Sequence, residues 1–274
     1  MKIKIAVVQF EIKQFHPEIN LKRAEQFVRK AASAGADIVS FPEDFITGPV
    51  GRKPEFADNS HQYRNLFISW ARKYRIDIVA GSVIEREKNR LYNTCYYIDA
   101  KGKVLARYRK VNLWVTEKAY MSPGTEAVVI KTKFGRIGLT ICWDLIFPEI
   151  FRDMMKKGVE IVFCVTLWKY KDAGRGLKYN PNAEIEAVNA LCTARAFENE
   201  TAIVFCNAAG TLAGTKDKDK LVGRSQIALP FKGCVRRFDH EREGMFIREI
   251  DTDILNVAEE AYQIKQDLGI GKRK

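Results

Sequence analysis

A helical stretch followed by an apolar run rich in Val and Ile occurs four times in this chain of 274 residues. In the first copy, residues 22–34 carry apolar side chains at helical spacing, Gly35 ends the helix, and ADIVSFPE follows as a strand. The later strands of this kind are IDIVAGSV, VEIVFCVTLW and TAIVFCNAAG. Strands without polar alternation are covered on both faces, so the pattern predicts a layered α/β fold.

The order of these units indicates two similar halves. IAVVQF, a helix and ADIVSFPE form one half, and IGLTIC, a helix and VEIVFCVT form the other. We expect each half to build one of two packed sheets, with hairpins over 93–110 and 224–251, where Lys-Gly pairs indicate turns. No linker rich in Gly, Ser or Pro separates the halves. The prediction is a single domain over 1–274, with a core over 1–255 and a tail over 256–274.

Composition narrows the class of protein. The hydrophobic content of 46% allows a large core, and no apolar run approaches the roughly 18 residues of a spanning helix. The N-terminus reads as a strand and not as a signal peptide, so we expect a cytoplasmic protein. The net charge is +12, but Lys and Arg are interleaved with acids and form no single stripe. This distribution argues for a solvated basic surface and against nucleic acid binding.

Cys142 stands apart from the other five cysteines. Those five lie inside strand or helix patterns, where a reduced, buried thiol is the default, and no CxxC pair suggests zinc. Cys142 ends the strand IGLTIC and precedes a helix start marked by Asp144 and Pro148. A thiol at such a turn faces the crevice beyond the strand ends, near backbone N–H groups. Its position fits a nucleophile and a structural thiol equally well.

A nucleophilic thiol needs a base, and the three histidines of the chain do not follow buried strands. Carboxylates at strand ends are the alternative, and Glu43 follows ADIVSF as Cys142 follows IGLTIC. Lys110 ends a third strand, VLARYR, and precedes apolar residues. Taken singly, Glu43 is also explained as an exposed capping acid and Lys110 as a surface lysine. The three strand ends together favour one shared crevice.

These motifs resemble the nitrilase superfamily of carbon–nitrogen hydrolases. The matching segments are FPED with Glu43, RKVNLWVTEKAYMSPG with Lys110, and GRIGLTICWDLIFPE with Cys142; ARAFEN, VFCNAAG and GRSQIALP match further along. The resemblance spans nearly the whole chain in order and spacing. It implies a four-layer α-β-β-α sandwich with two similar halves, assembled as a homodimer or larger homo-oligomer.

The resemblance also implies roles for individual residues. Glu43 is the general base, Cys142 the nucleophile that forms a thioester, and Lys110 with the Trp143 backbone N–H holds the oxyanion. Glu117 is expected to orient the substrate, although it is also explained as a surface acid, and Trp168 is expected to contact the substrate. The implied reaction cleaves the C–N bond of a small amide or N-carbamoyl compound, with no cofactor and no metal. Nitrile hydrolysis, acyl transfer to an amine and a catalytically silent binding scaffold remain open.

The substrate itself is not predicted. Asn112 stands where many family members carry histidine, and Ile146 stands where several subfamilies carry a basic residue before Phe-Pro-Glu. Residues 168–184 leave a strand at the same end as Cys142 and carry more Lys and Arg than Asp and Glu. If this basic loop formed the rim of the crevice, it would favour a substrate with a distal carboxylate. The alternative is a solvated polar loop with no role in selection.

Overall fold

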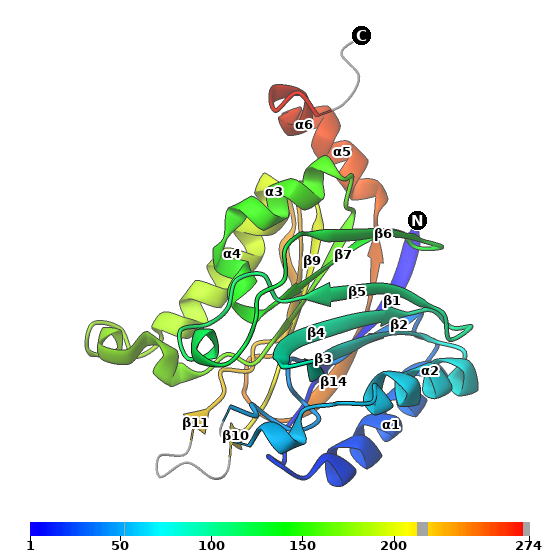
Figure 1. Ribbon diagram of the computed structural model, residues 1–274. Coiled ribbons are helices and arrows are strands. Elements are labelled where there is room, and N and C mark those ends of the chain that lie inside the picture. Colours follow the sequence, from blue (N-terminus) through cyan, green and yellow to red (C-terminus); the bar gives the residue numbers. More distant parts are fainter. Residues whose placement is uncertain (52, 213–218, 271–274) are drawn as a thin grey trace.

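Two six-stranded mixed sheets pack face to face in the computed structural model, which describes residues 1–51, 53–212 and 219–270 (Figure 1). The first sheet has the order β14-β1-β2-β3-β4-β5 and the second the order β13-β12-β9-β8-β7-β6. The strands of the first sheet are β1 (Lys2–Gln9), β2 (Ile38–Ser40), β3 (Asp77–Glu87), β4 (Arg90–Ile98), β5 (Val104–Arg109) and β14 (Gly244–Asp251). Those of the second are β6 (Val128–Thr132), β7 (Gly135–Ile141), β8 (Ile161–Thr166), β9 (Ala202–Asn207), β12 (Gln226–Leu229) and β13 (Gly233–Arg237).

The two sheets repeat the same pattern of neighbours. In each sheet three consecutive strands run parallel, β1, β2 and β3 in one and β7, β8 and β9 in the other. An antiparallel strand flanks each set on one side and an antiparallel hairpin on the other. The predicted α/β class and four-layer sandwich with two similar halves are therefore confirmed.

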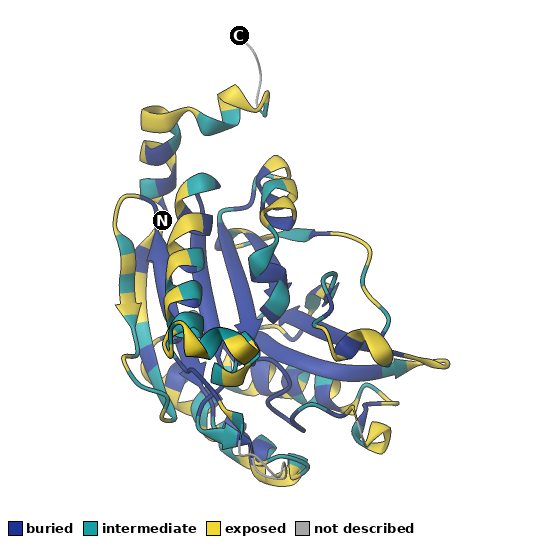
Figure 2. Ribbon diagram, turned by 90° about the vertical axis from the view of Figure 1, so that its left-hand side faces the viewer, coloured by how far each residue is buried: buried dark blue, intermediate teal, exposed yellow. Residues whose placement is uncertain are grey.

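Helices form the outer layers on both sides. They are α1 (Pro17–Ser33) and α2 (Gln62–Tyr74) on the first sheet, and α3 (Pro148–Lys156) and α4 (Ala183–Glu198) on the second. Figure 2 shows buried strands between helices that carry one buried and one exposed face. The close packing of α3 depends on Gly138, because a Cβ atom there would lie 2.7 Å from Met154 Sδ.

The expected hairpin over 224–251 is only partly correct. β12 and β13 pair with each other, but β14 leaves the second sheet and pairs antiparallel with β1 in the first. The chain end also differs from a plain tail, because it begins with α5 (Asp253–Tyr262) and α6 (Ile264–Asp267). Residues 271–274, the last part of the expected tail, lie outside the described residues. A small ladder of β10 (Thr211–Leu212) and β11 (Asp219–Lys220) completes the described strands.

Candidate active site

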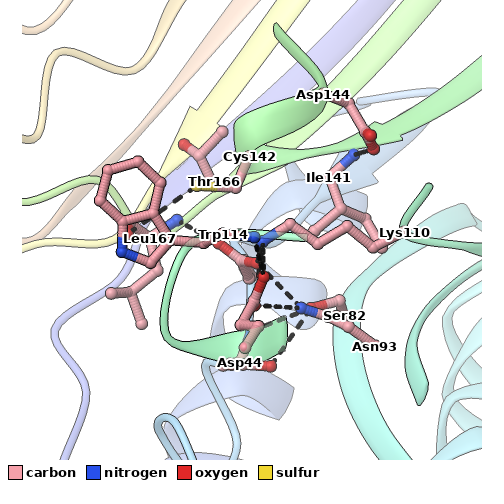
Figure 3. A network of polar contacts seen from close by, with 12 residues as sticks. Asp44, Ser82, Asn93, Lys110, Trp114, Ile141, Cys142, Asp144, Thr166 and Leu167 are labelled. Carbon is pink, nitrogen blue, oxygen red and sulfur yellow. Dashed lines mark hydrogen bonds and ion pairs between the residues drawn. The ribbon is translucent and has the colours of Figure 1, made fainter. Parts of the chain in front are cut away.

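Glu43 and Lys110 meet at one edge of the first sheet. Glu43 lies just beyond β2, and Lys110 follows β5 directly. β2 pairs parallel to β3, and β5 is two antiparallel steps from β3, so both strands end at the same edge. Lys110 Nζ donates to Glu43 Oε1 over 2.9 Å, and both side chains are buried. Figure 3 shows Lys110, Asn93 and Leu167 in the same network of polar contacts. The expectation that these strand ends share one location is therefore met in the structure.

Glu117 is the second carboxylate beside Lys110. It begins a 3-10 helix, η2 (Glu117–Ala119), and its Oε1 lies 2.9 Å from Lys110 Nζ. Its Oε2 accepts a 2.7 Å hydrogen bond from the Trp114 backbone N–H. Glu117 is buried, which excludes the alternative of a surface acid. One ammonium is thus held between two carboxylates.

Two further contacts fix the Glu43 carboxylate, and the sequence analysis missed both. Asn93 on β4 donates from Nδ2 to Glu43 Oε1 over 2.9 Å. The backbone N–H of Leu167, just beyond β8, donates to Glu43 Oε2 over 2.9 Å. The signal for Asn93 was present, since it is an amide near the start of the strand segment YNTCYYID, which is mostly aromatic and apolar. Leu167 offered no signal, because its backbone forms the contact.

Cys142 lies on a strained turn at the end of β7. Its φ angle is +47°, and it begins the 3-10 helix η3 (Cys142–Ile146). Asp144 holds this turn by accepting hydrogen bonds from Ile141 N (2.9 Å) and Tyr108 Oη (2.6 Å). The thiol is buried, with Sγ 4.0 Å from the Leu167 carbonyl oxygen. A left-handed backbone at a residue other than Gly costs free energy, so the surrounding contacts must hold this turn in place.

Burial and neighbouring charges shift the proton affinities of these groups. Burial raises the pKa of Glu43, although the Lys110 charge opposes it. Burial and the Glu43 charge hold the pKa of the Cys142 thiol well above its usual value. Burial alone would lower the pKa of Lys110, but Glu43, Cys142 and Glu117 outweigh it, so its pKa lies well above the usual value. At neutral pH the resting site therefore holds a thiol on Cys142 and an ammonium on Lys110, beside a Glu43 carboxyl group whose proton affinity is raised.

A cavity of about 70 Å³ connects these groups. Glu43, Lys110, Glu117 and Cys142 line it, and Trp143 and Trp168 contribute aromatic walls. The loop 168–184 carries four basic residues, Lys169, Lys171, Arg175 and Lys178. Of these, Lys169 is among the described residues that line the cavity. The size suits a small substrate.

Known proteins resemble this chain over nearly its whole length. The family model described as Carbon-nitrogen hydrolase matches residues 4–258. The chain belongs to the carbon–nitrogen hydrolase family. This hydrolase is 30% identical to the 2-oxoglutaramate amidase of Bacillus subtilis over 98% of both chains. It is 29% identical to a probable nitrilase of Schizosaccharomyces pombe, over 92% of this chain and 90% of the relative.

Solved structures show the same fold. Nit3 of Saccharomyces cerevisiae, a member of the nitrilase superfamily, matches with a TM-score of 0.81 at 24% identity, over 95% of this chain and 94% of Nit3. An amidase from Nesterenkonia sp. AN1, with acrylamide added at its active-site cysteine, matches with a TM-score of 0.79 at 23% identity. That match covers 97% of this hydrolase and 99% of the amidase chain.

The other five cysteines and Asn112 are not among the described residues that line the cavity. Cys95, Cys164, Cys192 and Cys206 are buried free thiols, whereas Cys234 is exposed, so its expected burial is wrong. Asn112 donates from both its backbone N and its Nδ2 to Asp144 Oδ1, which explains its place in the Lys110 motif.

Two absences hold for the residues that the structure describes. Within them, no cluster of three or more His, Cys, Asp or Glu side chains could hold a metal ion. No helix formed by them is long and apolar enough to cross a membrane.

Proposed function

We propose that this hydrolase cleaves the C–N bond of a small amide through a thioester on Cys142. The observation that carries the proposal is the shared cavity, in which the Cys142 thiol faces the Glu43–Lys110–Glu117 network. A thiol with a raised pKa needs an adjacent base to become nucleophilic, and Glu43 is the carboxylate placed for this role.

In the first half of the reaction, Glu43 accepts the Cys142 proton as Sγ bonds to the amide carbon. The carbonyl π bond breaks and its electron pair becomes the oxyanion. Lys110 Nζ and the Trp143 backbone N–H, at the start of η3, donate to this oxygen. One well-placed donor of this kind lowers the barrier by about 3–4 kcal/mol. Collapse of the intermediate breaks the C–N bond, and Glu43 returns its proton to the departing amine.

The second half repeats the same steps with water. Glu43 takes a proton from water as the water oxygen bonds to the thioester carbon. The C–S bond then breaks, the carboxylic acid is released, and Glu43 returns the proton to Sγ, which restores the Cys142 thiol. Asn93 and the Leu167 N–H hold the Glu43 carboxylate in one orientation through both halves. Glu117 holds Lys110 from the other side, so the ammonium stays aimed at the oxyanion position.

The names of relatives support an amide as substrate. The B. subtilis relative, matched over 98% of both chains, is a 2-oxoglutaramate amidase. The S. pombe relative is named a probable nitrilase, so nitrile hydrolysis by the same residues is the second candidate. N-carbamoyl cleavage and acyl transfer to an amine use the same thioester. Assembly as a homodimer or larger oligomer and a cytoplasmic location stay predictions.

The test is a hydrolysis screen with ammonia detection over small amides, N-carbamoyl compounds and nitriles. We expect amides to react, Cys142→Ala to abolish turnover without loss of fold, and the exposed-thiol control Cys234→Ala to keep it. Turnover of nitriles but not amides would replace the first candidate with the second. Full activity in Cys142→Ala would overturn the thioester mechanism. Added hydroxylamine that diverts product to a hydroxamate would reveal the acyl intermediate directly.

A further inference from the structure

The cavity contains more acids than bases. Its described lining residues include four carboxylates, Glu43, Asp44, Glu117 and Asp172, and two ammonium groups, Lys110 and Lys169. Glu43 and Glu117 lie 2.9 and 2.8 Å from the Lys110 ammonium, which leaves Asp44 and Asp172 as the two acidic residues without an ion pair to Lys110.

Lys169 offsets only part of the Asp172 charge. Its ammonium faces Asp219 on β11 at 3.6 Å. The Asp172 carboxylate accepts a 2.9 Å hydrogen bond from the Lys169 backbone N–H, which holds the start of the 3-10 helix η4 (Tyr170–Lys178). Burial raises the pKa of Asp172 to about 6, so this carboxylate is still mostly ionised at neutral pH. The charge at this part of the cavity is therefore negative.

Asp44 is, with Asp172, one of the two carboxyl groups of the cavity that the proposed mechanism does not use. Asp44 follows Glu43 directly in the chain, is 4% exposed and lines the cavity. Its φ angle of +50° is a conformation that an L-residue seldom adopts without a local reason. Among the described residues, Ser82 Oγ, 3.4 Å from Oδ1, is its hydrogen-bond donor, and no cation forms an ion pair with it.

The environment of Asp44 resists ionisation in the empty site. Burial raises its pKa well above the usual value, and the charges of Glu43 and Glu117 raise it further. A cation beside Asp44 would reverse this effect, because an opposite charge favours the ionised carboxylate. The Oδ2 atom of Asp44 accepts no hydrogen bond from the described residues, so an ammonium group of the substrate could donate to it.

Aromatic side chains surround the same space. Trp114, Trp143, Trp168 and Tyr120 all line the cavity. The ring centroids of Trp114 and Trp143 are 4.3 Å apart, and those of Trp143 and Trp168 are 5.9 Å apart. Aromatic faces beside carboxylates attract amines and other organic cations through the ring quadrupole. A substrate carboxylate would instead meet excess negative charge.

We propose that the substrate of this hydrolase carries an ammonium group distal to the scissile amide, and that Asp44 is the residue that pairs with it. The inference rests on the proposed amide hydrolysis and adds the charge of the substrate. It is opposite to the carboxylate preference that the basic loop 168–184 would give. It also separates this chain from its B. subtilis relative, whose 2-oxoglutaramate substrate is an anion.

The kinetic test compares a pair of amides of matched size, β-alanine amide (cation) and butyramide (neutral), and adds the larger succinic acid monoamide (anion). We expect kcat/KM to be highest for β-alanine amide, by about tenfold or more over butyramide, and lowest for the anion. In Asp44→Asn the ratio of β-alanine amide to butyramide should fall about tenfold. The matched control Asp153→Asn, on the exposed face of α3, should keep the wild-type ratio.

A binding test separates this inference from the proposed reaction. Calorimetry on Cys142→Ala measures affinity for the same amides without turnover. Tighter binding of β-alanine amide, with proton release that disappears in Asp44→Asn, is the expected result. This result would stand even if wild-type enzyme failed to hydrolyse amides. Equal or tighter binding of butyramide or succinic acid monoamide, or an Asp44→Asn variant with unchanged selectivity, would overturn the inference.

Discussion

Glu43 Oε2 accepts a 2.9 Å hydrogen bond from the Leu167 backbone N–H, which links the ends of β2 and β8 across the two sheets. The other oxygen of Glu43 binds Lys110 and Asn93, which belong to the first sheet. Leu167 also presents its carbonyl to Cys142 Sγ. The relative position of the two sheets therefore sets the distance and orientation between the base Glu43 and the nucleophile Cys142. Side-chain packing between the sheets thus contributes to the geometry of the site.

Replacing Glu43 with Gln should block acylation. The amide of Gln cannot accept the thiol proton, although it keeps the shape and part of the hydrogen bonding of the carboxylate. We expect kcat/KM to fall by at least about 100-fold, the lower range for a lost general base. Mass spectrometry after substrate addition should find no acyl adduct on Cys142. An adduct formed at the wild-type rate would exclude Glu43 as the base.

The pH dependence of kcat/KM should report the shifted pKa of Glu43. The base must be ionised, so activity is lost as pH falls through its pKa. Burial raises that pKa above the usual 4.5, so the acid limb of the profile should lie above pH 4.5. The measurement is kcat/KM for butyramide across the acid range, with stability checked at each pH. A limb at or below pH 4.5 would contradict the assignment.

The positions of Glu43, Lys110 and Cys142 were predictable because each follows a strand pattern, and parallel strands bring their ends to one edge. Glu117 could be assigned only through the family resemblance, since a 3-10 helix of three residues leaves little periodic signal. The role of the basic loop 168–184 was harder to predict, because a sequence does not show which way a charged side chain points. Lys169 lines the cavity while its ammonium is paired with Asp219.

The path of β14 was also beyond the sequence pattern. The hairpin signals at 224–251 describe local turns, and β13 does follow β12 as they predict. β14 instead pairs with β1 along eight residues, from Lys2 with Asp251 to Gln9 with Gly244. Such a pairing between the chain ends depends on which sheet edge is free, and local periodicity carries no information about that.

Loss of the Asp144 carboxylate should disturb the turn that carries Cys142. Its two oxygens accept from Tyr108 Oη, Ile141 N and both donors of Asn112, and Asp144→Asn would turn an N–H group toward these donors. We expect a loss of about 1–3 kcal/mol in unfolding free energy and a fall in kcat. Tyr108→Phe removes one of these donors and should have a smaller effect in both measurements. Unchanged kcat in a folded Asp144→Asn variant would show that this carboxylate does not position Cys142.

Glu200 should make stability depend on pH between about 4.5 and 7. Its side chain is fully buried beside Lys265 of α6, at 3.3 Å, and burial raises its pKa to about 7 from the usual 4.5. The folded state therefore binds more protons than the unfolded state in this range, so stability should decline as pH rises through it. The size is at most about 3.5 kcal/mol, because one pKa unit corresponds to about 1.4 kcal/mol.

The comparison of Glu200→Gln with Glu260→Gln tests this contribution. Glu260 lies on α5 and is exposed, so its variant should keep the wild-type slope of Tm against pH. Glu200→Gln should flatten that slope, because the amide has no proton to lose. The hydrogen bond from Glu200 lowers the pKa of Glu259 despite the burial of Glu259, so Glu259 should not supply the slope above pH 5. Equal slopes in the two variants would show that Glu200 does not titrate in the range assigned to it.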